Sequence, residues 1–238
     1  MIPLRDENPS GLKPAINYAL IALCVLAFLW QLSYGRAQEA VIYAFGFIPS
    51  VLFGYDELPA ELAKVPPTLT LFTSMFMHGG WMHLIGNMLY LWIFGDNVED
   101  AMGHVKYLIF YVLCGLAAAF TQALPDPHST IPMVGASGAI SGVLGAYLLL
   151  YPHARVLVLV PLGFFSRVMH LPASLVLSLW FALQFLSNLM STGGGGVAFR
   201  AHIGGFVAGL VLVAVFKRRE FRLFNPLRRE QRGSWPRR

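Results

Sequence analysis

The chain has 238 residues, of which 56% are hydrophobic and only 12% are charged, and its formal net charge is +5. Average soluble domains carry about 25% charged residues. This composition excludes an ordinary water-soluble globule and predicts that a lipid bilayer is the main solvent of the protein.

The start of the chain, from Met1 to Pro14, is polar and mixed in charge, and the first apolar run begins only near Ile16. A cleavable signal peptide places its apolar region closer to the start, so we expect this run to remain as a membrane span. Cys24 and Cys114 both lie inside apolar runs. That position favours buried free thiols over a disulfide framework or a thiolate metal cage.

Several apolar segments approach the roughly 20 residues that a helix needs to cross a bilayer. We predict six spans, at residues 16–34, 81–97, 106–124, 135–151, 171–190 and 200–216. The expected fold is therefore an all-α integral membrane protein with a six-helix bundle. Residues 1–15 form a cytoplasmic segment in this interpretation, 16–216 the membrane domain and 217–238 a basic tail.

Lysine and arginine predict the orientation of these spans, because they are retained on the cytoplasmic side of a membrane. With both termini inside, the inner segments hold Arg5, Lys13, Lys106, Arg155, Arg167 and nine more from Lys217 onward, whereas the outer segments hold Arg36, Lys64 and Arg200. We interpret the tail as an anchor of this orientation and not as a nucleic-acid-binding segment.

The first outer segment, at about 35–80, is unusually long. Its run at 41–49 is too short and too broken to span, but it is apolar enough to lie in the membrane interface beside the bundle. The last outer loop contains four consecutive glycines at 193–196, and we expect it to be mobile because glycine restricts the backbone least.

Polar residues gather near the expected outer ends of the second, fourth and sixth spans: His83 and Asn87, then Ser137, then His202. His83 and Asn87 are four residues apart, so they share one face of a helix. Ser137 follows Gly135 at the start of a span, where backbone N–H groups have no partner inside the helix. Such donors suit an oxyanion.

Small residues recur every four positions along two of these spans. They are Gly138, Gly142 and Ala146 on the fourth span, and Ala201, Gly205 and Gly209 on the sixth. Small residues at this spacing let helix backbones approach closely in lipid. If the two rows face each other, His202 comes within reach of the Ser137 hydroxyl and can act as its general base.

Three motifs together resemble the rhomboid family of intramembrane serine proteases. They are GAS137G, H83LIGN87 and the run from Ala201 to Gly209, in this order and on these spans. The start of the chain at 1–6 and the segment at 94–100 are also similar to bacterial members, so the resemblance covers nearly the whole chain.

The resemblance implies a six-helix core that cleaves transmembrane protein substrates in or beside their spans, in the cell membrane and without a cofactor. Ser137 and His202 match the family's dyad, which has no acidic third member. His83, Asn87 and the N–H of Ser137 match its oxyanion hole, which would open to the outer side. The fifth span matches the proposed substrate gate. The oligomeric state is not indicated.

Two positions depart from the family pattern: Leu69-Thr70 stand where Trp-Arg is frequent, and Ser141 stands where some members stack a tyrosine on the catalytic imidazole. The sequence therefore does not indicate what orients His202. Two alternatives stay open. One is a proteolytically inactive relative that binds transmembrane segments, and the other is a metal or haem protein with His78, His83 and His202 as ligands.

Overall fold

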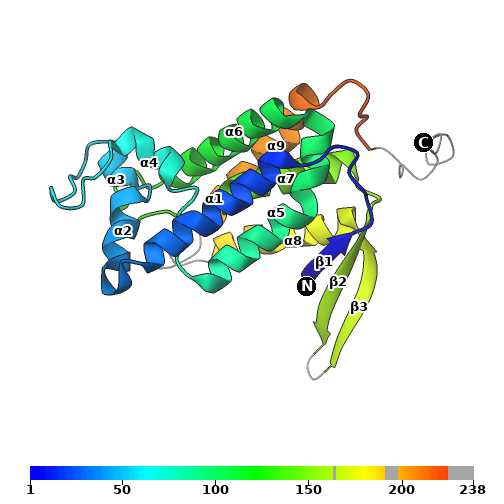
Figure 1. Ribbon diagram of the computed structural model, residues 1–238, viewed down its shortest axis with the longest axis horizontal. Helices are drawn as coiled ribbons and strands as arrows, with labels where there is room; N and C mark the ends of the chain where they lie inside the picture. Colours follow the sequence, from blue (N-terminus) through cyan, green and yellow to red (C-terminus); the bar gives the residue numbers. More distant parts are fainter. Residues whose placement is uncertain (163–164, 191–197, 225–238) are drawn as a thin grey trace.

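The computed structural model describes residues 1–162, 165–190 and 198–224, and in this part of the chain long helices form a bundle (Figure 1). These helices are α1 (Ala15–Leu32), α5 (Trp81–Met102), α6 (His104–Ala123), α7 (Ser137–Leu150), α8 (Ala173–Met190) and α9 (Phe199–Phe216). They lie on the six segments expected from the sequence. Among them α1, α6, α8 and α9 are long and apolar enough to cross a membrane, and α7 is a shorter apolar helix.

The prediction that the chain is all-α is wrong. A three-stranded antiparallel sheet lies at one end of the bundle, in the order β1 (Ile2–Asp6), β2 (Arg155–Leu162) and β3 (Phe165–Pro172). The sequence RVLVLVPL of β2 is rich in valine, which favours strands, and eight residues are too few for a spanning helix. Because Pro172 ends β3, α8 begins at Ala173 and not at 171.

The N-terminal segment is tied to the C-terminal end of α5. Besides the β1–β2 pairing, the Asn8 amide donates to the Asn97 side chain, and the Gly11 N–H donates to the Asp100 carboxylate at 2.7 Å. Helix α5 runs five residues past its expected end and stops at Gly103, whose φ of +81° favours glycine. The polar residues at 96–100 are therefore docking positions for the start of the chain.

Helices α7 and α9 run parallel in close contact through glycine. A Cβ at Gly205 would overlap the carbonyl oxygen of Gly138, and one at Gly209 would overlap that of Gly142. Helix α6 covers the other side of α7 at Cys114, which lies against Gly142. Every residue of α7 from Gly138 to Tyr147 is buried, so α7 is the central helix of the bundle.

The first loop packs onto the bundle near the start of α7. It contains η1 (Gly35–Ala37), α2 (Gln38–Phe45), α3 (Pro49–Leu52) and α4 (Pro67–Thr73). Phe47 is fully buried and exchanges backbone hydrogen bonds of 3.0 and 2.7 Å with Met133, and Thr73 Oγ1 donates to the carbonyl of Phe45 at 2.6 Å. The loop is thus docked despite Leu69-Thr70, while its place in the membrane interface stays a prediction.

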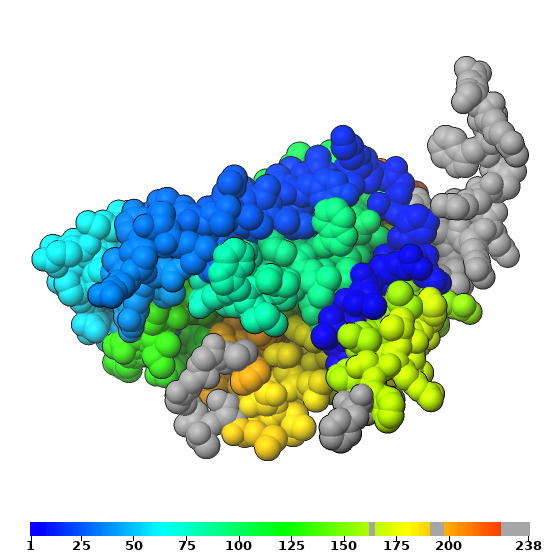
Figure 2. Space-filling view, turned by 60° about the horizontal axis from the view of Figure 1, so that its bottom comes forward, coloured from blue at the N-terminus to red at the C-terminus, as the bar shows by residue number. Residues whose placement is uncertain are grey.

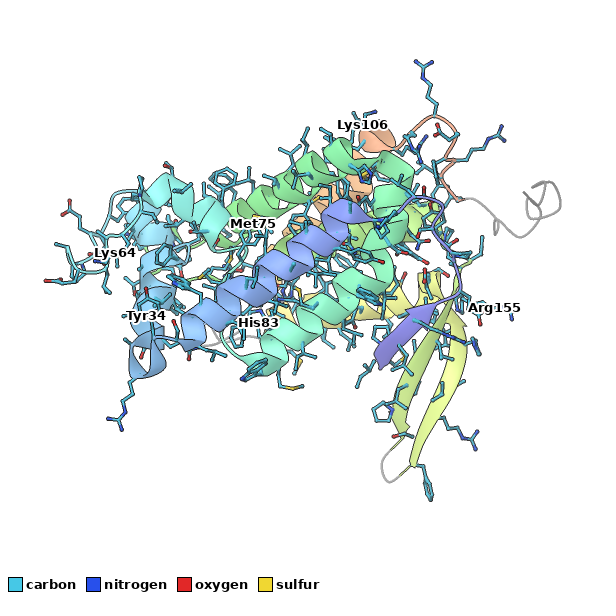
Figure 3. The ribbon with its side chains drawn as sticks, in the orientation of Figure 1. Tyr34, Lys64, Met75, His83, Lys106 and Arg155 are labelled. Atoms are coloured by element: carbon cyan, nitrogen blue, oxygen red, sulfur yellow. The ribbon has the colours of Figure 1, made fainter. Side chains whose placement is uncertain are left out.

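Three basic residues that the sequence assigns to opposite sides of the membrane lie toward different ends of the bundle, while the orientation itself stays a prediction. Figure 3 shows Tyr34 and Lys64 at one end, and Lys106 and Arg155 toward the other. The four-glycine loop at 193–196 and the tail beyond residue 224 lie outside the described residues.

Candidate active site

Helices α5, α7 and α9 begin at the same end of the bundle. Ser137 is the first residue of α7, His202 lies in the first turn of α9, and His83 and Asn87 lie in the first two turns of α5. Helices α5 and α7 run in the same direction. Near their starts, His83 lies beside Gly135, and about three turns further along, the Phe94 ring meets the Tyr147 ring edge-on, with centroids 4.9 Å apart. The structure therefore brings together the four polar residues that the sequence singled out.

The imidazole of His202 joins two side chains. Its Nε2 lies 2.8 Å from Ser137 Oγ, and its Nδ1 lies 2.8 Å from Gln184 Oε1 on α8. An amide oxygen only accepts hydrogen bonds, so Nδ1 carries the proton in the neutral ring and Nε2 keeps a lone pair toward the serine hydroxyl. This is the tautomer that can remove a proton from Ser137.

Gln184 is a contact that the sequence analysis missed. Two other side chains lie beside Ser137 and His202. The Trp180 ring lies 6.0 Å from the His202 ring at 40°, and Ser141 Oγ donates back to the carbonyl of Ser137 at 2.6 Å. The signal for Gln184 was present as an amide inside the apolar run of α8, one turn after Trp180, although Asn188 is a second amide in the same helix. Only the packing of α8 on α9 shows which histidine it meets.

His83 and Asn87 converge on the backbone that leads into Ser137. A Cβ added at Gly135, where φ is +122°, would lie 2.6 Å from His83 Nε2 and 3.6 Å from Asn87 Nδ2. A side chain at this position would thus be strained and would collide with His83. The Gly79 N–H donates to His83 Nδ1 at 3.3 Å, which leaves the Nε2–H of the neutral ring free to donate toward the site.

Asn87 carries an unused donor. Its side chain is 9% exposed, and its Nδ2 is buried with no hydrogen-bond partner among the described residues. Buried polar groups are almost always paired, so an orphaned donor beside Gly135 needs an explanation. Ser137 N–H is also without an acceptor inside its helix, because it opens α7. Together these donors surround a position suited to a negatively charged oxygen.

His78 is part of the support of the site. It is 1% exposed, its backbone exchanges hydrogen bonds of 3.0 and 3.1 Å with the Gln31 side chain on α1, and its ring lies 5.1 Å from that of His83. Burial, and then the neighbouring His83, lowers the pKa of His78 to about 4, so it is neutral at physiological pH. Nowhere in residues 1–162, 165–190 and 198–224 do three His, Cys, Asp or Glu side chains gather in a way that could hold a metal ion.

Comparisons with known proteins all point to one family, the rhomboid proteins. Residues 67–219 match the family model of the Rhomboid domain. The chain is 29% identical to Rhomboid protease GluP of Bacillus subtilis over 85% of its length, and 28% identical to Rhomboid protease GlpG of Haemophilus influenzae over 82%. It is also 35% identical to Inactive rhomboid protein 1 of Drosophila melanogaster, over 34% of this chain and 6% of that protein.

The matches differ in how much of each relative they cover. The chain spans 35% of the length of GluP, 60% of RHOMBOID-like protein 5 of Arabidopsis thaliana and 88% of GlpG. The family model extends from α4 to just beyond the end of α9 and therefore includes all four polar residues of the site. With its apolar, membrane-capable helices, the chain is an integral multi-pass membrane protein that belongs to the rhomboid family.

Proposed function

We propose that this protein is an intramembrane serine endopeptidase that hydrolyses peptide bonds in or beside transmembrane segments of other membrane proteins. The observation that carries the proposal is the 2.8 Å contact between His202 Nε2 and Ser137 Oγ. The Gln184 Oε1 atom at His202 Nδ1 supports the tautomer that a general base needs. The relatives named rhomboid proteases support it.

The reaction begins with attack of Ser137 Oγ on the scissile carbonyl carbon while the hydroxyl proton passes to His202 Nε2. The carbonyl oxygen becomes an oxyanion, held by the Ser137 N–H, His83 Nε2–H and Asn87 Nδ2. The C–N bond then breaks as His202 gives its proton to the leaving amine. Water attacks the resulting ester, His202 accepts its proton and returns one to Ser137 Oγ, and the new carboxyl end is released.

Water must therefore reach the site. Ser137 and His202 are both partly exposed, which supports access from the end of the bundle where α5, α7 and α9 begin. In the proposed topology six helices span the cell membrane, both termini are cytoplasmic, the site opens to the outer side, and the first loop lies in the membrane interface. The separation of Lys64 from Lys106 and Arg155 supports this orientation.

The proposed division of the chain follows from this topology. Residues 16–216 carry the six-span protease, residues 1–15 are a cytoplasmic segment that docks on it, and 217–238 are a basic tail. Gly135 leaves room for His83, and Gly138, Gly142, Gly205 and Gly209 let α7 and α9 approach so closely that the dyad can form. Transmembrane proteins and lipids are the proposed partners.

Cleavage of a single-span reporter in liposomes tests the proposal. The wild type should cleave it with and without a metal chelator, and Ser137→Ala and His202→Ala should each abolish cleavage while Ser178→Ala and His153→Ala, in exposed positions away from the site, keep it. Chelator-sensitive cleavage would favour the histidine-ligated metal alternative. A folded wild type that binds the reporters and cuts none of them would favour the inactive binder.

A further inference from the structure

The catalytic imidazole contacts a residue on a helix that is otherwise loosely attached. The buried side chains of α8, Ala173, Val176 and Leu177, all lie in its first five residues. Figure 2 shows α8, in yellow, at the outer edge of the molecule beside α9, in orange. Beyond its buried start, α8 meets α9 through the rings of Trp180 and Phe181, which lie against His202 and Phe206, and then through Gln184.

The contact of Gln184 is not needed to bury apolar surface. Gln184 itself is partly exposed, and the residues after it, Phe185 and Leu186, are about half exposed. Long polar side chains have rotamer freedom to lose when they are fixed. An amide held at 2.8 Å from His202 Nδ1 in such an environment points to a role toward the histidine and not toward the packing of α8.

The chemistry of the dyad requires that role. The base must present a lone pair at Nε2, and this happens in the neutral ring only when Nδ1 carries the proton. Gln184 Oε1 accepts the hydrogen bond from the Nδ1–H of His202, and it still accepts this bond when His202 becomes doubly protonated during the reaction. A neutral amide therefore satisfies both protonation states without placing a charge inside an apolar bundle, where an ionised carboxylate is costly.

Other groups near His202 do not supply this contact. Ser141 turns back to the carbonyl of Ser137, and Trp180 meets the imidazole through ring packing alone. The His83 ring, on another helix, lies beside Gly135. On the described residues, Gln184 Oε1 is the acceptor placed at Nδ1.

We propose that Gln184 is a positioning residue that fixes the tautomer and orientation of His202 from α8, so that the proposed protease uses a Ser137–His202–Gln184 arrangement. This inference rests on the proposed dyad. It also makes the state of the base depend on the position of α8, since the hydrogen bond forms only when that helix lies against α9.

Two substitutions of similar size separate this role from packing. Gln184→Met keeps the length of the side chain and removes the acceptor, whereas Gln184→Glu keeps an acceptor oxygen and adds a charge. We expect Gln184→Met to lower kcat roughly 2- to 10-fold, the range set by the net strength of one hydrogen bond, with KM unchanged. Gln184→Glu should retain more of the kcat than Gln184→Met.

The matched control is Gln122→Met on α6. Gln122 Oε1 accepts the backbone N–H of Ala201 at 3.3 Å, so it contacts the start of α9 directly beside His202 but does not contact the imidazole. Its replacement should leave kcat close to that of the wild type. Equal losses in both Met variants would show a general disturbance of α9 and overturn the proposal, as would full activity of Gln184→Met with loss in Gln184→Glu.

A second measurement does not depend on proteolysis. Nitrogen NMR of histidine-labelled protein in nanodiscs reports which ring nitrogen of His202 is protonated, with His202→Ala used to assign the signal. The wild type should show the Nδ1–H form, and Gln184→Met should show a mixture with the Nε2–H form. An unchanged tautomer in Gln184→Met would overturn the positioning role. If Ser137→Ala still cleaved the reporter, the dyad would be overturned, but the NMR result would still show whether Gln184 sets the tautomer of His202.

Discussion

The Glu99 carboxylate on α5 accepts the backbone N–H of Asn17 at 2.7 Å, across 82 positions of the sequence. The same carboxylate accepts the N–H of Ile16 at 3.0 Å and lies 2.5 Å from His104 Nδ1. It thus pairs two of the backbone donors that the start of α1 leaves open, and a negative charge is favourable at a helix N-terminus. Glu99 itself is fully buried.

Removal of this carboxylate should destabilise the fold. Glu99→Ala leaves the buried N–H of Asn17 and the partly buried N–H of Ile16 without an acceptor, and each such group costs about 1–3 kcal/mol. We therefore expect the free energy of unfolding to fall by about 2–6 kcal/mol, measured by denaturation in detergent micelles. Glu99→Gln keeps one acceptor oxygen and should lose less. Equal stability of Glu99→Ala and the wild type would contradict the capping role.

Glycine at the contact of α7 and α9 should not tolerate a methyl group. A Cβ at Gly209 overlaps the carbonyl oxygen of Gly142, whereas a Cβ at Gly86 on α5 meets no atom within 4 Å. Gly209→Ala should cost about 1–3 kcal/mol through overpacking. Gly86→Ala should be neutral or stabilising by up to about 1 kcal/mol, since alanine favours helix more than glycine does.

Thermal midpoints of these two variants check the prediction, with cleavage measured in parallel. A Gly209→Ala protein as stable as Gly86→Ala would show that the backbones of α7 and α9 do not approach as closely as described.

Asn87 and Asn17 are both buried helix asparagines, and they should respond in opposite ways to alanine. Asn87 Nδ2 has no partner among the described residues, so Asn87→Ala should leave stability unchanged or raise it. The loss of one oxyanion donor should lower kcat about 100- to 1000-fold.

Asn17 is the opposite case. Its Nδ2 donates to the carbonyl of Leu91 at 3.0 Å, and its Oδ1 accepts from the Tyr107 hydroxyl at 2.8 Å. Asn17→Ala should therefore lower the thermal midpoint and leave the kcat of the folded fraction unchanged. If Asn87→Ala instead lost stability and kept kcat, Asn87 would be a packing residue.

The Asp6 carboxyl on β1 makes stability depend on pH. Burial raises the pKa of Asp6 from its usual value of 3.8 to about 7, although the Tyr147 hydroxyl, which donates to it at 2.5 Å, opposes that rise. The folded protein therefore holds a proton that the unfolded chain releases. The stability that this protonation supplies is complete below pH 3.8 and is lost as the pH rises through about 7.

Asp6→Asn removes this dependence and keeps an acceptor for Tyr147. The thermal midpoint of the variant should match that of the wild type near pH 4, exceed it increasingly as the pH rises to about 7, and then differ by a constant amount. A difference between the two proteins that does not change with pH would mean that Asp6 is ionised in the fold throughout.

The sequence by itself predicted the long helices and singled out the four polar residues that the structure brings together. Apolar runs long enough for a bilayer predict α1, α6, α8 and α9 because lipid leaves a spanning backbone few options other than a helix. The four-residue spacing of Gly138 and Gly142, and of Gly205 and Gly209, predicted a close helix contact, since that spacing puts small residues on one face. His83, Asn87, Ser137 and His202 stood out because polar groups are costly in apolar runs.

Only the tertiary structure decided the sheet and the partner of His202. Strand β1 pairs with β2 from a part of the chain about 150 residues away, and no local periodicity carries that information. Gln184 meets His202 because α8 packs antiparallel on α9, and its sequence position fits many other contacts equally well. Local sequence patterns show the spacing of apolar and polar residues along each helix or strand. Which atom faces a given ring nitrogen depends on how whole helices pack against one another.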